Sequence, residues 1–96
     1  MLESTVERYF VQRVRDCGGL AEKFTSPSRR HVPDRLVTLP NVPLHLVELK
    51  RPGEKPRPGQ VRDHARRAAL GHRVYVIDSL GAVNKYISNI RKGALT

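Results

Sequence analysis

Apolar side chains near both ends of the chain recur at spacings of three and four residues, the pattern of a helix with one buried face. The first stripe consists of Val6, Phe10, Val14 and Cys17. The second stripe consists of Leu80, Val83, Ile87 and Ile90. We predict a first helix that starts at a capping box, Ser4-Thr5-Val6-Glu7, and ends at Gly18-Gly19, and a last helix over about residues 79–92.

Four runs between these helices have the composition of β-strands. They cover residues 20–25, 34–39, 44–50 and 73–78. The segment Pro40-Asn41-Val42-Pro43 is typical of a turn, so the second and third strands are expected to form a hairpin. The run 73–78 is almost continuously apolar, which predicts a central strand covered on both faces.

Between the third and fourth of these strands, a further helix is predicted from about Pro58 to Leu70, and Gly71 ends it. Its inward face is expected to consist of Val61, Ala65 and Ala68. The preceding segment 51–58 is rich in proline, which lacks an amide donor, and should be an exposed basic loop. The order αβββαβα predicts an α/β sandwich, and 96 residues suit a single domain over residues 1–96.

The charge of the chain points to a polyanionic partner. Eighteen Lys and Arg stand against nine Asp and Glu, which gives a formal net charge of +9. Nucleic acid is the leading partner, although a membrane surface or a ribosomal assembly also fits such a charge. With three Tyr, two Phe and no Trp, the chain lacks the rings of a stacking platform for single strands.

Cysteine and histidine usage argues against disulfides and zinc. Cys17 is the one cysteine, and the four histidines show no metal-ligand spacing. No apolar run approaches the roughly 20 residues that cross a bilayer, and the first residues do not resemble a secretion signal. A cytoplasmic protein that does not contact a membrane is therefore expected.

Two carboxylates are expected to meet at the end of the hairpin. If the hairpin is symmetric about Asn41, Asp34 lies opposite Glu48, with β-carbons about 4.5 to 5.5 Å apart. Alternation puts Lys50 on the same face as Glu48. Apolar packing should continue this face through Leu36, Leu44 and Leu46. Two like charges so close destabilise the strand pair unless a divalent cation lies between them.

The same residues suit metal-assisted hydrolysis. Mg²⁺ uses one or two protein carboxylates and completes its shell with water and phosphate oxygens, so Asp34 and Glu48 supply a minimal site. Such a metal lowers the pKa of an attacking water. Lys50 could neutralise charge that develops on the phosphate, or could act as a general base if its pKa is depressed.

The pair Pro33-Asp34 followed by Glu48-Leu49-Lys50 resembles the signature of the PD-(D/E)XK nucleases. Within that superfamily the chain most resembles the stand-alone VRR-NUC (virus-type replication-repair nuclease) domains. Glu7 on the opening helix, Gln60 after the proline-rich loop and the closing strand and helix add to the likeness. The resemblance covers about residues 3–90 and implies a restriction-endonuclease-like core with a mixed sheet flanked by helices.

The resemblance also implies an activity and a set of site residues. It implies a DNA endonuclease that uses Mg²⁺ or Mn²⁺ and favours branched or structured DNA such as four-way junctions. The metal ligands would be Asp34, Glu48 and the backbone carbonyl of Leu49. Lys50 would assist the attack, and Glu7 and Gln60 would complete the site. The chain departs from many relatives at His31-Val32, where a small or glycine-preceded residue is usual.

Simpler explanations exist for several of these residues. Glu7 is also the third residue of a capping box, and Gln60 could face water in the first turn of its helix. His64, one helical turn after Gln60, is assigned to a solvated helix face rather than to catalysis. A phosphate-binding rim is expected from Arg51, Lys55, Arg57 and Arg62, which Arg66 and Arg67 on the same helix could join. Solvated surface charge is the alternative for each of these residues.

A non-catalytic nucleic-acid-binding module that kept the fold is the rival function. A pure binder gains nothing from opposed carboxylates in a phosphate-facing groove, since without metal they repel the ligand. The carboxylate pair therefore favours the enzyme. A homodimer is expected as well, because one site cuts one strand and the resembled domains pair to act on branched DNA.

Overall fold

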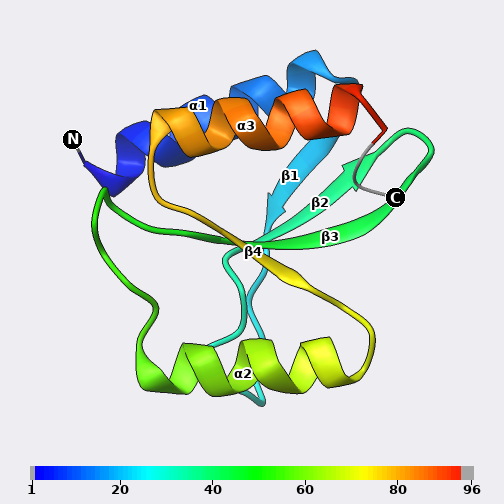
Figure 1. The fold of residues 1–96 in the computed structure, drawn as a ribbon. Coiled ribbons are helices and arrows are strands. Elements are labelled where there is room, and N and C mark those ends of the chain that lie inside the picture. Colours follow the sequence, from blue (N-terminus) through cyan, green and yellow to red (C-terminus); the bar gives the residue numbers. More distant parts are fainter. Residues whose placement is uncertain (1, 94–96) are drawn as a thin grey trace.

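The computed structural model describes residues 2–93 and has the predicted element order (Figure 1). The helices are α1 (Glu3–Asp16), α2 (Pro58–Ala69) and α3 (Leu80–Arg91). The strands are β1 (Leu20–Lys23), β2 (Arg35–Leu39), β3 (Val42–Leu49) and β4 (Val74–Ile77). They form one sheet in the order β1-β2-β3-β4, antiparallel except for the parallel pair of β3 and β4. The mixed sheet flanked by helices confirms the predicted fold class.

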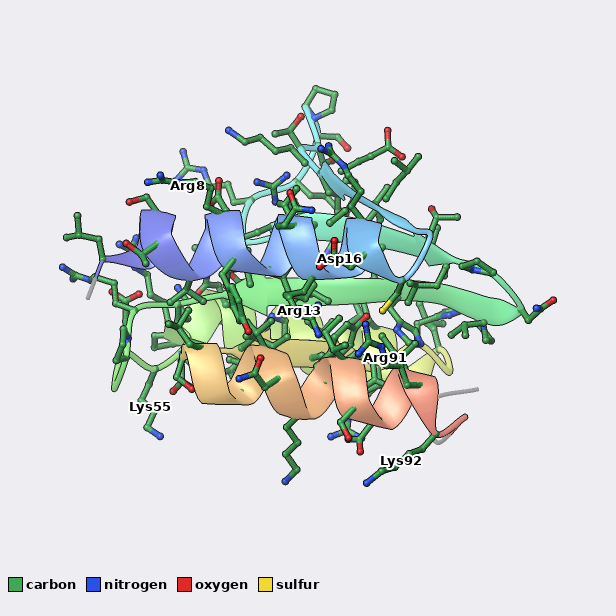
Figure 2. The ribbon with its side chains drawn as sticks, turned by 90° about the horizontal axis from the view of Figure 1, so that it is seen from above. Arg8, Arg13, Asp16, Lys55, Arg91 and Lys92 are labelled. Atoms are coloured by element: carbon green, nitrogen blue, oxygen red, sulfur yellow. The ribbon has the colours of Figure 1, made fainter. Side chains whose placement is uncertain are left out.

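The helices divide between the two faces of the sheet. Helices α1 and α3 lie side by side over one face, and α2 covers the other (Figures 1 and 2). The core under α1 and α3 contains the predicted helix stripes, with Val6, Phe10, Val14 and Val83 all 0% exposed. Burying one such side chain contributes about 1.5–3 kcal/mol. Among residues 2–93, no helix is long and apolar enough to cross a membrane.

The start of α1 differs from the prediction. The helix begins at Glu3, with Leu2 in extended conformation at the N-cap and no side chain capping the end. The capping box at Ser4-Thr5-Val6-Glu7 is therefore not formed, because Ser4 already lies within the helix. Glu7 uses its carboxylate elsewhere, as described below.

Strand β4 was expected in the centre of the sheet but lies at its edge, paired only with β3. Its two faces are covered unequally. Ile77 is 3% exposed and Tyr75 packs against the rings of His45 and Tyr86, whereas Val76 on the opposite face is 42% exposed. A continuous apolar run does not distinguish a central strand from an edge strand whose two faces are covered unequally.

Candidate active site

The β2–β3 hairpin has the register predicted from its turn. The paired residues are Arg35 and Val47, Leu36 and Leu46, and Val37 and His45. The register shifts only near the turn, where Asn41 adopts a φ of 59°. Extending the pairing by one residue places Asp34, which directly precedes β2, opposite Glu48. Leu46 is buried as expected, but Leu44, which lies close to the turn of the hairpin, is 55% exposed.

The carboxylate of Asp34 is fixed to the end of β3. Its Oδ2 accepts a hydrogen bond from the backbone N–H of Leu49 at 2.8 Å. The backbone carbonyl of Asp34 accepts a second bond, from Phe24. The side chain and the backbone carbonyl of Asp34 are thus both hydrogen-bonded. The carboxylate lies beside the peptide bond that joins Glu48 to Leu49. The structure brings together the predicted residues at the end of the hairpin.

Glu48 is the most deeply buried charged side chain of the site, with 1% of its surface exposed. Its Oε2 accepts a hydrogen bond from Gln60 Nε2 at 3.1 Å and lies 3.9 Å from Lys50 Nζ. Its Oε1 lies 3.4 Å from His64 Nε2. Burying an unpaired carboxylate costs several kcal/mol, and these donors offset that cost. Lys50, itself 8% exposed, lies on the same face as predicted.

Helix α2 turns a polar face toward the sheet, contrary to the prediction. Val61 is 52% exposed, and Ala65 and Ala68 are exposed too. The side chains that turn inward are Gln60, Asp63, His64 and Arg67. Their spacing is helical. Asp63 is buried and the other three are half-buried, and each has a polar partner, whereas one valine and two alanines offer little apolar area. Gln60 and His64 face the buried carboxylate of Glu48, whereas Asp63 and Arg67 pair with each other.

Gln60 links the start of α2 to the candidate site. Its Oε1 accepts from the backbone N–H of Arg57 at 2.8 Å, which occupies the N-cap position. The amide group is thereby oriented with its nitrogen toward Glu48. The predicted role of Gln60 at the site has a physical basis, since one side chain fixes both the helix end and the carboxylate.

His64 is a site residue that the sequence analysis left out. Burial lowers the pKa of its imidazole, with nearby Arg67 and Lys50 acting in the same direction and Asp63 and Asp34 against it. The neutral ring therefore prevails near neutral pH. The available signal was its position one turn after Gln60, which places both residues on one helix face.

Glu7 is held by an arginine rather than by the hairpin carboxylates. Its Oε1 accepts from Arg35 Nη2 at 2.8 Å, and Arg35 also donates to the carbonyl of Ala21. Glu7 nevertheless lines the same pocket as Asp34, together with Lys23. The structure thus places Glu7 next to Asp34 but in an ion pair of its own.

The oxygen donors of the hairpin fit a hard divalent cation. Within residues 2–93 there is no group of three or more His, Cys, Asp or Glu side chains arranged to hold a metal. The available protein donors are the two carboxylates of Asp34 and Glu48 and the carbonyl of Leu49. This small, all-oxygen set is what Mg²⁺ or Mn²⁺ accepts when water and phosphate oxygens fill the remaining positions.

The predicted phosphate rim lies on the proline-rich loop and the first turns of α2. Lys55, Arg57 and Arg62 are exposed, and Lys55 extends outward from the loop (Figure 2). Arg51 is exposed as well, but its guanidinium contacts Glu54 Oε2 at 3.3 Å. Three of the four rim residues therefore have no ion-pair partner within the part of the chain that the structure describes.

Comparisons with known proteins point in one direction. No protein-family profile matches the chain. A protein of Acyrthosiphon pisum secondary endosymbiont phage 1, named "Putative nuclease p44", is 58% identical over 77 residues, which cover 80% of this chain and 83% of that protein. A solved structure described as "VRR_NUC domain" is 37% identical with a TM-score of 0.84, over 90% of this chain and 94% of that one.

Proposed function

The chain belongs to the VRR-NUC domain family, and from that premise we propose that it is a divalent-metal-dependent endonuclease that hydrolyses phosphodiester bonds in DNA. The observation that carries the proposal is the environment of Glu48. Its side chain is 1% exposed, yet it lies in a basic region, and the carboxylate of Asp34 is held next to it by the backbone N–H of Leu49. Buried negative charge weakens phosphate binding, so a pure binding module has no use for it. A hydrolase needs it as a metal ligand.

Each residue of the site has a distinct part in this activity. Asp34, Glu48 and the carbonyl of Leu49 would hold Mg²⁺ or Mn²⁺. When bound, the metal supplies Lewis-acid stabilisation of the phosphate and a water of lowered pKa. Gln60 orients the Glu48 carboxylate through the 3.1 Å hydrogen bond.

Lys50 is the residue that we assign to the reaction itself. Its ammonium lies 3.9 Å from Glu48 Oε2 and is 8% exposed. A cation held in this way needs little rearrangement to neutralise charge on the phosphate as the bond breaks. Glu7 would hold Arg35 and the floor of the pocket beside Asp34.

The preferred substrate is branched or structured DNA, such as a four-way junction, held through the phosphates by Arg51, Lys55, Arg57 and Arg62. A homodimer acting in the cytoplasm suits this substrate, because each copy holds one candidate site and two strands must be cut. A twofold partner would also cover apolar side chains on the outer surface of α2 and the sheet. Exposed examples are Leu44, Val61, Leu70 and Val76.

A cleavage assay tests the proposal. Linear duplex, flap and four-way-junction DNAs are incubated with the protein in Mg²⁺, in Mn²⁺ and in EDTA. Cleavage is expected with either metal, fastest on the junction, and absent in EDTA. Binding without cleavage under all these conditions would favour the non-catalytic module instead. Light scattering with and without DNA tests the homodimer.

A further inference from the structure

A strongly basic pocket lies beside the candidate active site, between α2 and the segment that joins β1 to β2. Its volume is about 220 Å³. Its cationic lining residues are Arg29, Arg30, Arg62 and Arg66. The lining contains a single carboxylate, Asp63, which is 4% exposed. Four guanidinium groups around one pocket repel each other unless an anion is shared between them.

Asp63 is already engaged by two arginines. Its Oδ2 accepts from Arg67 Nε at 2.7 Å, and its Oδ1 lies 3.7 Å from Arg29 Nη2. Asp63 therefore anchors Arg29 at the pocket and leaves the other guanidiniums available. Arg30 and Arg66 are exposed and make no ion pair within residues 2–93. Guanidinium forks match the oxygens of a phosphate group in a bidentate manner.

The shape of the pocket depends on a close contact between its two walls. His31 adopts a φ of 63°, in the left-handed region, and its ring lies against Gly59 near the start of α2. A β-carbon at Gly59 would lie 2.5 Å from the ring, which is closer than atoms can approach. The absence of a side chain at Gly59 therefore lets the His31 ring pack against the start of α2.

The pocket and the carboxylates share α2. Gln60 and His64 contact Glu48, while their chain neighbours Gly59 and Asp63 line the pocket. Gln60 and Arg66 are separated by about 9 Å along the helix axis, at 1.5 Å per residue. Successive phosphates of one strand advance by about 3.4 Å along the axis of a duplex, so this distance lies within reach of a few nucleotides. A DNA strand at the carboxylates therefore reaches the pocket.

We propose that this pocket is a phosphate-binding subsite that holds the DNA backbone a few nucleotides from the bond to be cut. The inference rests on the proposed nuclease function. It adds Arg29 and Arg30 to the phosphate contacts, it places Arg66 beside them, and it gives His31 and Gly59 the role of setting the pocket geometry. The subsite fixes the position of the strand and so determines which phosphodiester bond faces Glu48.

Removing charge from the pocket is the first test. The double variant Arg30→Ala/Arg66→Ala is compared with Lys85→Ala/Arg91→Ala, which removes the same charge from α3 on the opposite face of the sheet (Figure 2). Binding to a labelled 20-base-pair duplex is measured by fluorescence anisotropy in EDTA across a salt series. The pocket variant should lose affinity on the order of tenfold to a hundredfold and show a salt slope shallower by about 1 to 2. The α3 variant should lose much less.

A change of shape without a change of charge is the second test. Gly59→Ala forces the His31 ring to move, whereas Gly81→Ala at the corresponding second position of α3 meets only Ser79 Oγ at 3.9 Å. Alanine favours helix over glycine, so both variants should fold. Gly59→Ala should weaken DNA binding by about fivefold or more, as expected for one lost phosphate contact, and Gly81→Ala should not.

Two outcomes overturn the subsite. One is an equal loss of affinity in the pocket and α3 double variants, which would mean that only overall charge matters. The other is unchanged binding by Gly59→Ala. The proposed nuclease function is judged separately, by metal-dependent cleavage in the parent protein. A parent that cleaves DNA while Gly59→Ala binds normally contradicts the subsite alone. A parent that binds through the pocket but never cleaves contradicts the nuclease alone.

Discussion

On one face of the sheet, α1 and α3 bury an apolar core, whereas on the other face α2 buries charged and amide groups around Glu48. The first face can be explained by area removed from water. The second face cannot, because buried polar groups contribute little net stability even when all are paired. We infer that the α1/α3 face maintains the fold and that the α2 face has been kept for chemistry. Substitutions on the two faces should therefore have different consequences.

The largest effect is expected in the core under α1. Phe10 is 0% exposed, and its ring packs against the ring of Tyr86 with the two ring centroids 5.5 Å apart. Phe10→Ala leaves a cavity between the two helices and the sheet, and the free energy of unfolding should fall by about 3–5 kcal/mol. Urea denaturation followed by circular dichroism measures this. A loss below 1 kcal/mol would show that the α1/α3 face is not the main source of stability.

On the α2 face, Lys50→Ala should affect the reaction far more than the fold. Removing a cation that stabilises the transition state should lower single-turnover cleavage by a factor on the order of 10², which corresponds to about 2.7 kcal/mol. Both carboxylates remain, so Mn²⁺ binding measured by calorimetry should persist. Glu48→Gln is the matched contrast, since it should lose Mn²⁺ binding and cleavage together. Cleavage by Glu48→Gln at the parent rate would remove Glu48 from the site.

The same difference between the faces explains which features could be predicted from the sequence. The stripes of α1 and α3 were read correctly because apolar periodicity reports burial against an apolar core. The hairpin register followed from the turn around Asn41, and it placed Asp34 by Glu48. The apolar periodicity predicted the wrong inward face for α2, because Val61 is exposed to solvent. The inward face there is set by partners on the sheet, which a single-residue hydrophobicity pattern does not contain.

Other misreadings have local causes. The sequence Ser4-Thr5-Val6-Glu7 satisfies the capping-box pattern, but Glu7 forms an ion pair with Arg35, a residue 28 positions away. His64 was assigned to solvent because an isolated histidine usually is. Its contact with Glu48 depends on the position and rotation of α2 on the sheet, and these cannot be predicted from a local sequence pattern. Residue spacing alone therefore placed the residues of one hairpin, whereas across two distant elements it missed His64, and Gln60 was assigned there only through the family resemblance.

A matched pair of valines compares the two faces directly. Val83 on α3 is 0% exposed and Val61 on α2 is 52% exposed. Val83→Ala removes two buried methyl groups and should lower the free energy of unfolding by at least about 1.5 kcal/mol. Val61→Ala should be neutral or stabilise by a few tenths of a kcal/mol through helix propensity. Urea denaturation at low protein concentration compares the two. A concentration-dependent loss in Val61→Ala would instead place Val61 in the homodimer interface.

The smallest effect concerns two histidines, one on each face. His45 is 6% exposed on the core face, where its Nδ1 lies 2.8 Å from the hydroxyl of Tyr86, and His64 lies beside Glu48 on the other. Burial lowers the pKa of both imidazoles below the ordinary value of 6.5. Protons therefore bind the unfolded chain more readily than the folded one. Stability should be fully present above pH 6.5 and should fall as the pH drops through the two folded-state pKa values.

Variants can assign this pH dependence to each face. The free energy of unfolding is measured from pH 7.5 to pH 5, where the parent should lose stability steadily. His45→Asn and His64→Asn should each flatten the curve, because each removes one group that prefers to be neutral when folded. His72→Asn, at an exposed position, is the control and should leave the slope unchanged. If only His64→Asn flattened the curve, the pH dependence of the free energy of unfolding would come from the α2 face alone. The prediction that both faces contribute to it would then be wrong.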